Sequence, residues 1–256
     1  MEYKRAFLFG CSWTSFSYPT WANIMQKDLD IPVYNWGWSG TGNVAIQHRM
    51  VQCDLLNKFT EHDLIIPLWS SWTREDRYEE EGWFNVGSVL NQLPESKYDE
   101  TFVRNHWRWE NDVVKNSTAI ITANKMFPIW KNFSIVPIDD DHIMSKFYSE
   151  HLPEIDVWTN VQSPNSKLVD DNHPSIIQHK EFVKDKIYPK LSITMKNSTE
   201  QSVHDYHNEL QEKLAMQKTP YEDYLGIART LWEKHNFKKH PQFDWNGGSL
   251  NPELFK

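Results

Sequence analysis

Residues 6–14 read AFLFGCSWT, and this stretch decides the fold. Its apolar first half ends at Gly10, which predicts a buried strand followed by its exit turn. The same arrangement returns at residues 33–36, before Gly37, and a third apolar run covers residues 64–68. Short apolar runs of this kind, separated by helical patterns, predict a parallel sheet covered on both faces by helices.

Helical periodicity fills the spaces between the predicted strands. The segment from 41 to 59 carries most of an apolar face, and Pro19 is placed to open a shorter helix. The patterns predict helices over 19–29, 41–59, 112–130 and 175–191, and a further strand over 134–138. The expected fold is therefore an α/β three-layer sandwich. Ligands of such sheets bind beyond the carboxyl ends of the strands, so the exit loops are where chemistry is expected.

The chain divides into a larger and a smaller part. Residues 1–192 carry the strand–helix alternation, which 75–109 interrupts with an acidic and then Trp- and Asn-rich insertion. Residues 193–256 form a helical appendage, in which capping signals predict two charged helices over about 199–217 and 220–235. The appendage has three open uses: packing on the domain, forming homo-oligomers, or docking a partner.

Composition excludes several classes of function. The net charge of −8 disfavours nucleic acid and anionic membrane surfaces as partners. No segment approaches the roughly 20 apolar residues of a membrane helix, and residues 1–5 lead into the first strand without a signal-peptide core. We therefore expect the chain to be cytoplasmic, or to leave its cell by a route that the sequence does not show. The 13 Trp and 13 Phe supply a packed core although only 39% of residues are hydrophobic.

Neither cysteines nor acidic clusters predict a metal or a disulfide framework. Cys11 and Cys53 are the two cysteines of the chain and are not spaced as metal ligands. Residues 139–142 read DDDH, but adjacent carboxylates on a loop are more often solvated than metal-bound. We expect no metal at these residues.

Three loops, distant along the chain, carry the residues of a serine hydrolase. Residues 9–14 read FGCSWT, residues 35–43 read NWGWSGTGN, and residues 170–175 read DDNHPS. The first two follow predicted strands and the third precedes a predicted helix. Each loop is a weak signal alone, and their order along the chain is what favours a common site.

Each residue type has a chemical reason to be there. The Ser12 hydroxyl needs a base to become a nucleophile, and His173 has an imidazole suited to that task. Asp170, three residues earlier, can orient the imidazole and stabilise its charged form. The amides of Ser12 and of the Gly40 turn can donate to the oxyanion of a tetrahedral intermediate. Cys11 is an alternative nucleophile, although the middle of the turn suits a small inward-facing group.

These residues resemble the SGNH/GDSL hydrolase family. Residues 10–12 look like the family's Gly-Asp-Ser block with Cys in place of Asp, and Ser39-Gly40 looks like its second block. Asp170 and His173 match its Asp-x-x-His block. The resemblance covers about residues 5–191 and implies a flavodoxin-like five-stranded sheet and ester hydrolysis without metal or cofactor. Few Gly with many Asn, Lys and Trp make the chain similar to family members found in phage genomes.

One block departs from the family pattern. The third strand of the family ends in Gly-x-Asn-Asp, whose Asn side chain is an oxyanion donor. Here residues 68–74 read LWSSWTR, and Ser71 stands at the Asn position. Loss of one such donor lowers the rate by about a hundredfold or more. Three alternatives follow: Ser71, Asn43 or Arg74 replaces the donor, the enzyme is slow, or the scaffold is non-catalytic.

Tryptophans gather in the same exit loops. Trp13, Trp36, Trp38, Trp69 and Trp72 fall in or beside them. Their faces could line a carbohydrate-binding cleft, or their side chains could pack in the core, which is the commoner use of Trp. Both roles stay open at this stage.

The sequence predicts a serine esterase that hydrolyses a small acyl ester through an acyl-enzyme. An O-acetyl group on a carbohydrate is the preferred substrate because of the Trp-rich loops, and Trp13, Trp38, Trp69, Trp72, Asn43 and Arg74 are the candidate binding residues. The alternatives are a non-catalytic binding or structural module on a degenerate SGNH scaffold, and an acyltransferase in which an acceptor hydroxyl replaces water.

Overall fold

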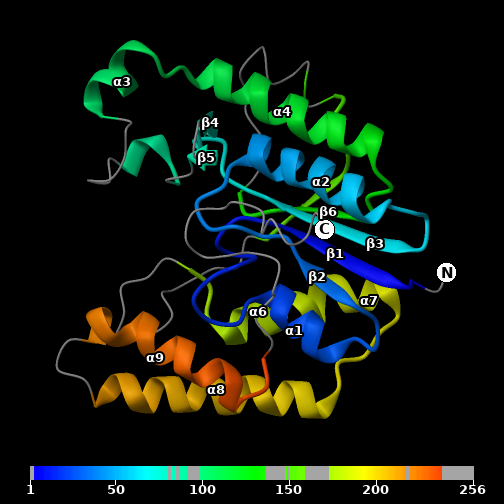
Figure 1. The fold of residues 1–256 in the computed structure, drawn as a ribbon, viewed down its shortest axis with the longest axis vertical. Helices are drawn as coiled ribbons and strands as arrows, with labels where there is room; N and C mark the ends of the chain where they lie inside the picture. Colours follow the sequence, from blue (N-terminus) through cyan, green and yellow to red (C-terminus); the bar gives the residue numbers. More distant parts are fainter. Residues whose placement is uncertain are drawn as a thin grey trace.

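A five-stranded parallel sheet forms the middle layer of the molecule (Figure 1). The structure is a computed structural model, and it describes residues 3–79, 82–84, 87–91, 99–136, 148, 150–158, 173–216 and 220–237. The strands are β1 (Arg5–Gly10), β2 (Val33–Asn35), β3 (Asp63–Trp69), β6 (Asn132–Ser134) and β7 (Ile155–Val157). Their order, β2-β1-β3-β6-β7, is the flavodoxin-like order, and every neighbouring pair is parallel.

Helices cover both faces of the sheet, which confirms the predicted three-layer α/β/α fold (Figure 1). One face carries α2 (Asn43–Asn57) and α4 (Trp109–Met126), which pack on each other. The other face carries α1 (Trp21–Asp28) and a bent helix made of α6 (Ile176–Phe182), η2 (Val183–Ile187) and α7 (Tyr188–Leu191). Within the described residues, no helix combines the length and the hydropathy needed to cross a membrane.

The sheet separates two hydrophobic cores, and alternate side chains of its central strands belong to one core or the other. In β1, Ala6 and Leu8 pack toward α1, whereas Phe7 and Phe9 pack toward α2. This is the two-residue alternation of a strand. Because both faces of β1 are covered, the strand reads as a continuous apolar run, as strands of buried parallel sheets do.

Two C-terminal helices lie on the α1 and α6 side of the sheet, and α8 packs against both of these helices (Figure 1). They are α8 (Asn197–Ala215) and α9 (Pro220–Lys234). Tyr206 of α8 belongs to the core on this side and donates from its hydroxyl to the Ala228 carbonyl at 2.8 Å. The Trp232 indole of α9 donates to the Ser17 carbonyl at 2.8 Å, which ties α9 to the β1 exit loop. A domain boundary near residue 192 stays a prediction, and these contacts show the helices packed on the sheet domain.

The predicted insertion contains short elements of its own. An antiparallel hairpin joins β4 (Arg77–Glu79) and β5 (Gly82–Phe84), and η1 (Val89–Asn91) and α3 (Glu100–Asn105) follow. The two ends of the hairpin segment pair with each other, because Arg74 and Ser88 form an antiparallel bridge and the Val89 amide donates to the Thr73 carbonyl at 2.9 Å.

Two predicted elements are shifted. The helix expected over 112–130 runs from Trp109 to Met126, because Pro128 keeps Phe127 in an extended conformation. The strand expected over 134–138 runs from Asn132 to Ser134, and its first residue is a buried Asn that accepts from the Trp69 indole at 2.9 Å.

Candidate active site

Ser12 lies in the tight turn that follows β1. The amides of Thr14 and Ser15 both donate to the Cys11 carbonyl, at 2.8 and 3.0 Å, and close the turn. A Cβ on Gly10 would lie 2.1 Å from the Thr14 hydroxyl oxygen, so only glycine fits at the strand end. Ser12 is 3% exposed, and none of the described residues forms a hydrogen bond with its hydroxyl or its amide.

The exit loops of β1 and β2 are joined by hydrogen bonds. Asn35 donates from its side-chain amide to the Thr14 carbonyl at 2.8 Å and accepts from the Gly37 amide at 2.9 Å. The Trp38 amide donates to the Gly10 carbonyl at 2.9 Å. These bonds hold the two loops side by side at the carboxyl edge of the sheet.

The turn at Gly40 leads into α2. Gly40 has φ of 82°, a left-handed conformation that favours glycine. The Thr41 hydroxyl closes the turn by donating to the Trp38 carbonyl at 2.6 Å. The Gly40 amide has no acceptor in the part of the chain that the structure describes. It is therefore available as a donor to a ligand.

The polar side chains after β3 are already engaged. Asn43 accepts from the Ser70 amide at 2.7 Å and donates to the Ser70 carbonyl at 3.1 Å, so its side chain ties α2 to the end of β3. The Ser71 and Thr73 hydroxyl oxygens lie 3.1 Å apart, and Thr73 continues to the Ser88 hydroxyl at 2.8 Å. An oxyanion role for either Ser71 or Asn43 remains a prediction and competes with these bonds.

Arg74 and Asp76 contact the loop that carries Gly40. Arg74 donates from Nη1 to the Thr41 carbonyl at 2.9 Å. The carboxylate of Asp76 accepts from the Gly42 amide at 2.7 Å and from the Ala45 amide at 3.0 Å. Burial raises the pKa of Asp76 to about 6, against the opposing effect of these two amides. The sequence analysis missed Asp76, because nothing in its spacing connects it to a glycine 34 residues earlier.

His173 lies against the loop that carries Ser12. Its ring stacks on Phe16 with a centroid distance of 4.0 Å, and the Tyr18 hydroxyl donates to the Pro174 carbonyl at 2.8 Å. Ser175 then caps α6 in a capping box. Within the described residues, no hydrogen bond joins the Ser12 hydroxyl to the His173 ring. Asp170 lies outside the described residues, as do 139–142.

The five tryptophans divide between the core and the surface. Trp36, Trp69 and Trp72 are 1%, 0% and 8% exposed, so they have the core role that the sequence left open. The predicted ligand stacking of Trp69 and Trp72 is not supported, because both rings are covered by neighbours of the α2-side core. Trp13 and Trp38 are partly exposed. The Trp13 ring meets Trp158 edge-on at 5.0 Å, and the Arg49 guanidinium lies 4.9 Å from the Trp38 ring centre.

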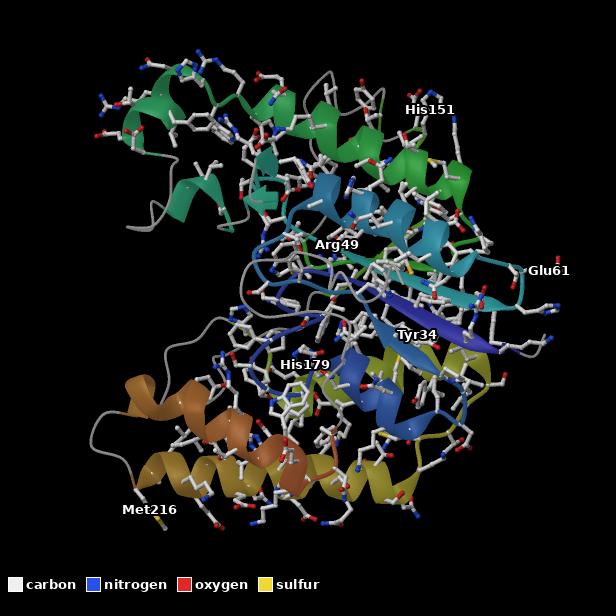
Figure 2. All side chains as sticks on the ribbon, in the orientation of Figure 1. Tyr34, Arg49, Glu61, His151, His179 and Met216 are labelled. Atoms are coloured by element: carbon white, nitrogen blue, oxygen red, sulfur yellow. The ribbon has the colours of Figure 1, made fainter. Side chains whose placement is uncertain are left out.

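His179 is a buried histidine behind the His173 segment. It lies on the α6 side of the sheet, whereas Arg49 lies on the α2 side (Figure 2). Its ring packs between Trp158 and Tyr18, at 5.2 and 6.3 Å, and neither ring nitrogen has a hydrogen-bond partner among the described residues. Burial lowers its pKa well below the ordinary value, so the ring is neutral. Cys11 is fully buried, as expected for an inward-facing group.

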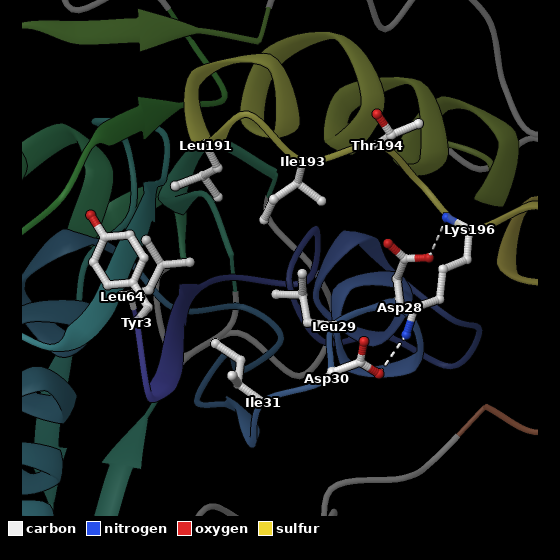
Figure 3. A pocket seen from close by; sticks show the side chains of 10 residues that line it. All are labelled: Tyr3, Asp28, Leu29, Asp30, Ile31, Leu64, Leu191, Ile193, Thr194 and Lys196. Carbon is white, nitrogen blue, oxygen red and sulfur yellow. Dashed lines mark hydrogen bonds and ion pairs between the residues drawn. The ribbon is translucent and has the colours of Figure 1, made fainter. Parts of the chain in front are cut away.

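A cavity of about 420 Å³ lies at the opposite edge of the sheet (Figure 3). Tyr3 and Leu64, at the amino ends of β1 and β3, line it together with Leu29, Ile31 and residues that follow α7. An ion pair between Lys196 and Asp30, 2.6 Å long, lies at its rim. The cavity is therefore separate from the strand-exit loops. Within the described residues, no cluster of three or more His, Cys, Asp or Glu side chains could hold a metal ion.

Comparisons with known proteins add a distant structural neighbour. No protein-family model matches the sequence, and no curated protein matches it. The structure is similar to the crystal structure of a catalytic mutant of Axe2, an acetylxylan esterase from Geobacillus stearothermophilus, with 11% sequence identity over 93% of this chain and 97% of that chain. The TM-score is 0.30, which is too low to assign this chain to a family or an activity.

Proposed function

We propose that the protein is a serine esterase of the SGNH type, with Ser12 as nucleophile, His173 as general base and Asp170 as the carboxylate behind the base. The observation that carries the proposal is the contact between two segments that are distant in sequence. Phe16, four residues after Ser12, stacks on His173 at 4.0 Å. The Ser12 hydroxyl and the His173 imidazole, which are 161 positions apart in the sequence, therefore belong to the same edge of the sheet.

The amides around Ser12 support an oxyanion site. The Ser12 and Gly40 amides lie on adjacent exit loops and have no acceptor among the described residues. Buried backbone donors are normally paired, so the unpaired amide of the 3% exposed Ser12 favours a bound oxygen. The Gly40 amide belongs to a partly exposed residue and is open to the same ligand. In the proposed mechanism these amides bind the oxyanion that forms when Ser12 attacks an ester carbonyl.

The proton transfers follow from the residue types. His173 takes the Ser12 proton as the hydroxyl oxygen attacks, and it returns that proton to the leaving alcohol oxygen. Water, deprotonated by the same imidazole, then attacks the acyl-enzyme carbonyl and releases the acid and the free Ser12 hydroxyl. The hydroxyl and the ring must come within about 2.6–3.2 Å for these steps, and catalytic hydrogen bonds often tighten only when substrate binds.

We propose a small acyl ester as substrate, with an O-acetyl group on a carbohydrate as the first choice. Trp13 and Trp38 are the partly exposed tryptophans of the exit loops and are suited to stack on a sugar ring. A 3% exposed Ser12 favours a short acyl chain over a long one. A higher kcat/KM is expected for an acetylated sugar than for ethyl acetate, which is also an unactivated alkyl ester, and equal values for the two remove the basis for the carbohydrate.

Two observations favour a second candidate, a non-catalytic binding module on the same scaffold. Ser71, at the position of the family's oxyanion Asn, bonds with Thr73, and the Ser12 hydroxyl does not bond with His173. A module of this kind binds an acetylated sugar through the same loops without hydrolysing it.

Hydrolysis of 4-nitrophenyl acetate separates the two candidates. The esterase hypothesis predicts turnover by the wild-type chain and a loss of about a thousandfold or more in His173→Ala, because the base is removed. His179→Gln is the matched control, since it changes a buried histidine of α6, the helix that follows His173, and this histidine has no assigned role in the chemistry. Wild-type turnover equal to that of His173→Ala would contradict the esterase hypothesis and favour the module.

A further inference from the structure

The segment after β3 holds the loop of residues 40–42 from three directions. Arg74 donates to the Thr41 carbonyl at 2.9 Å, and Asp76 accepts from the Gly42 amide at 2.7 Å. The Gly87 amide donates to the Gly40 carbonyl at 3.3 Å. The loop is thus bonded to Arg74 and to two residues of the insertion, Asp76 and Gly87, and not to its own neighbours alone.

The contact leaves no space between the two segments. A Cβ on Gly42 would lie 2.7 Å from Asp76 Oδ2 and 2.9 Å from the Arg74 Cβ. The second carboxylate oxygen reaches the Ala45 amide, so Asp76 also occupies the amino end of α2, where the helix dipole favours negative charge. The position of the loop therefore depends on the carboxylate.

We propose that Asp76 is a positioning residue that fixes the 40–42 loop so that the Gly40 amide points at the oxyanion, and that Arg74 assists it. The inference rests on the proposed function, because the loop matters only if Gly40 is a donor. It assigns a role to the insertion, whose first residues clamp the oxyanion loop. Neither Asp76 nor the insertion belongs to the blocks through which the chain resembles its family.

The charges around Asp76 come from two elements. Arg74 lies on its own segment, and Lys115 of α4 lies close enough to lower its pKa. Asp112 of α4 interacts with Asp76 as a like charge and, like Asp76, has a pKa raised to about 6 by burial. Asp112 accepts from the Trp107 indole at 2.6 Å and, within the described part of the chain, forms no hydrogen bond with the 40–42 loop. The chain thus offers a second buried carboxylate as a matched control.

The test compares Asp76→Asn with Asp112→Asn in steady-state hydrolysis of 4-nitrophenyl acetate at pH 8. In Asp76→Asn a side-chain NH₂ faces one of the two amides that the carboxylate bonded, and the loop shifts. The expected result is a fall in kcat of about 10- to 100-fold with KM changed by less than about threefold, since the donor acts mainly on the transition state. Asp112→Asn is expected to keep kcat within about threefold.

Labelling of Ser12 with a fluorophosphonate gives the fraction of active sites, so that kcat refers to folded enzyme only. If Asp76→Asn folds poorly, Arg74→Met, a change at a partly exposed side chain, is expected to lower kcat by about three- to tenfold through the loss of one bond to the loop. An unchanged kcat per labelled site in both variants overturns the clamp and leaves the esterase intact. A wild-type chain that neither reacts with fluorophosphonate nor hydrolyses the ester overturns both.

Discussion

The exit loops of β1 and β3 each carry a serine, and the two serines differ in exposure and in hydrogen bonding. Ser12, after β1, has no hydrogen-bond partner among the described residues although it is 3% exposed. Ser71, after β3, is more exposed and shares its hydroxyl with Thr73. Ser12 Oγ is not a fully buried atom, unlike the unpaired Ser70 Oγ at the end of β3, so the Ser12 hydroxyl is the one that a ligand or a catalytic base can reach.

The ends of β1 and β3 are also held in place by different means. β1 ends at Gly10, where the chain turns under tight steric limits, and β3 ends at Trp69, whose indole is bonded to Asn132 inside the core. The β1 loop is shaped by backbone geometry, and the β3 loop is anchored by a side chain. Function is therefore expected to depend on the first loop, and stability to depend on both.

The largest expected difference is in activity. Ser12→Ala is predicted to lower kcat/KM for 4-nitrophenyl acetate by about a thousandfold or more, because the nucleophile is lost. Ser71→Ala is predicted to lower it by less than about tenfold, because its hydroxyl is bonded to Thr73. A loss of a hundredfold in Ser71→Ala would give Ser71 the oxyanion role and break the comparison between the two loops. Ser15→Ala, in the same turn as Ser12, is the control.

Substitution of the loop tryptophans is expected to affect stability at one position and substrate binding at the other. Trp69→Ala is predicted to lower the free energy of unfolding by about 3–5 kcal/mol, because a fully buried ring is removed. Trp38→Ala, which removes a partly exposed ring and its contact with Arg49, is predicted to cost about 1 kcal/mol and to raise KM for an acetylated sugar. Urea unfolding and initial rates measure the two effects. Equal losses of stability would show that Trp38 is also a core residue.

Glycine at the end of β1 is expected to be indispensable. Gly10→Ala is predicted to lower the free energy of unfolding by about 3 kcal/mol, because the new Cβ meets both Thr14 and the Leu68 carbonyl, which is 2.9 Å away. Gly226→Ala in α9 has open space around the added Cβ and is predicted to stabilise by about 0.5–1 kcal/mol. Urea midpoints that shift in opposite directions from that of the wild type would support the steric account. An unchanged midpoint in Gly10→Ala would refute it.

The last comparison concerns the pH dependence of stability. Burial raises the pKa of Asp76 from 3.8 to about 6, so folding takes up a proton between about pH 4 and 6. The contribution of this carboxyl to the free energy of unfolding therefore falls as pH rises through that window. Asp76→Asn removes the dependence, so its stability relative to wild type should rise by about 1–3 kcal/mol from pH 4 to pH 6. A constant difference in urea unfolding across these pH values would show that Asp76 is not the buried acid described.

Most of the sheet and its helices could be predicted from the sequence, because long apolar patterns repeat with the period of each element. The strands β1, β2 and β3 and the helices α2, α8 and α9 were predicted within a few residues of their observed bounds. The strand β7 was missed, because three residues reading IDV carry no periodic signal and its place is set by pairing with β6.

The candidate site was predictable only where residues near in sequence act together. The Ser12 turn, the Gly40 turn and the block ending in His173 each show a local pattern. The bonds of Asp76 to α2 and of Asn43 to Ser70 join segments that the fold brings together, and no local pattern reports them. Burial of Trp69 and Trp72 likewise follows from the packing of α2 and α4 on the sheet.

Reaction with a fluorophosphonate, followed by peptide mass spectrometry, tests the central claim most directly. The account predicts one adduct, on the peptide that contains Ser12, formed by the wild-type chain and much more slowly by His173→Ala. An adduct on another residue, or a Ser12 adduct that forms at the same rate without His173, would contradict it.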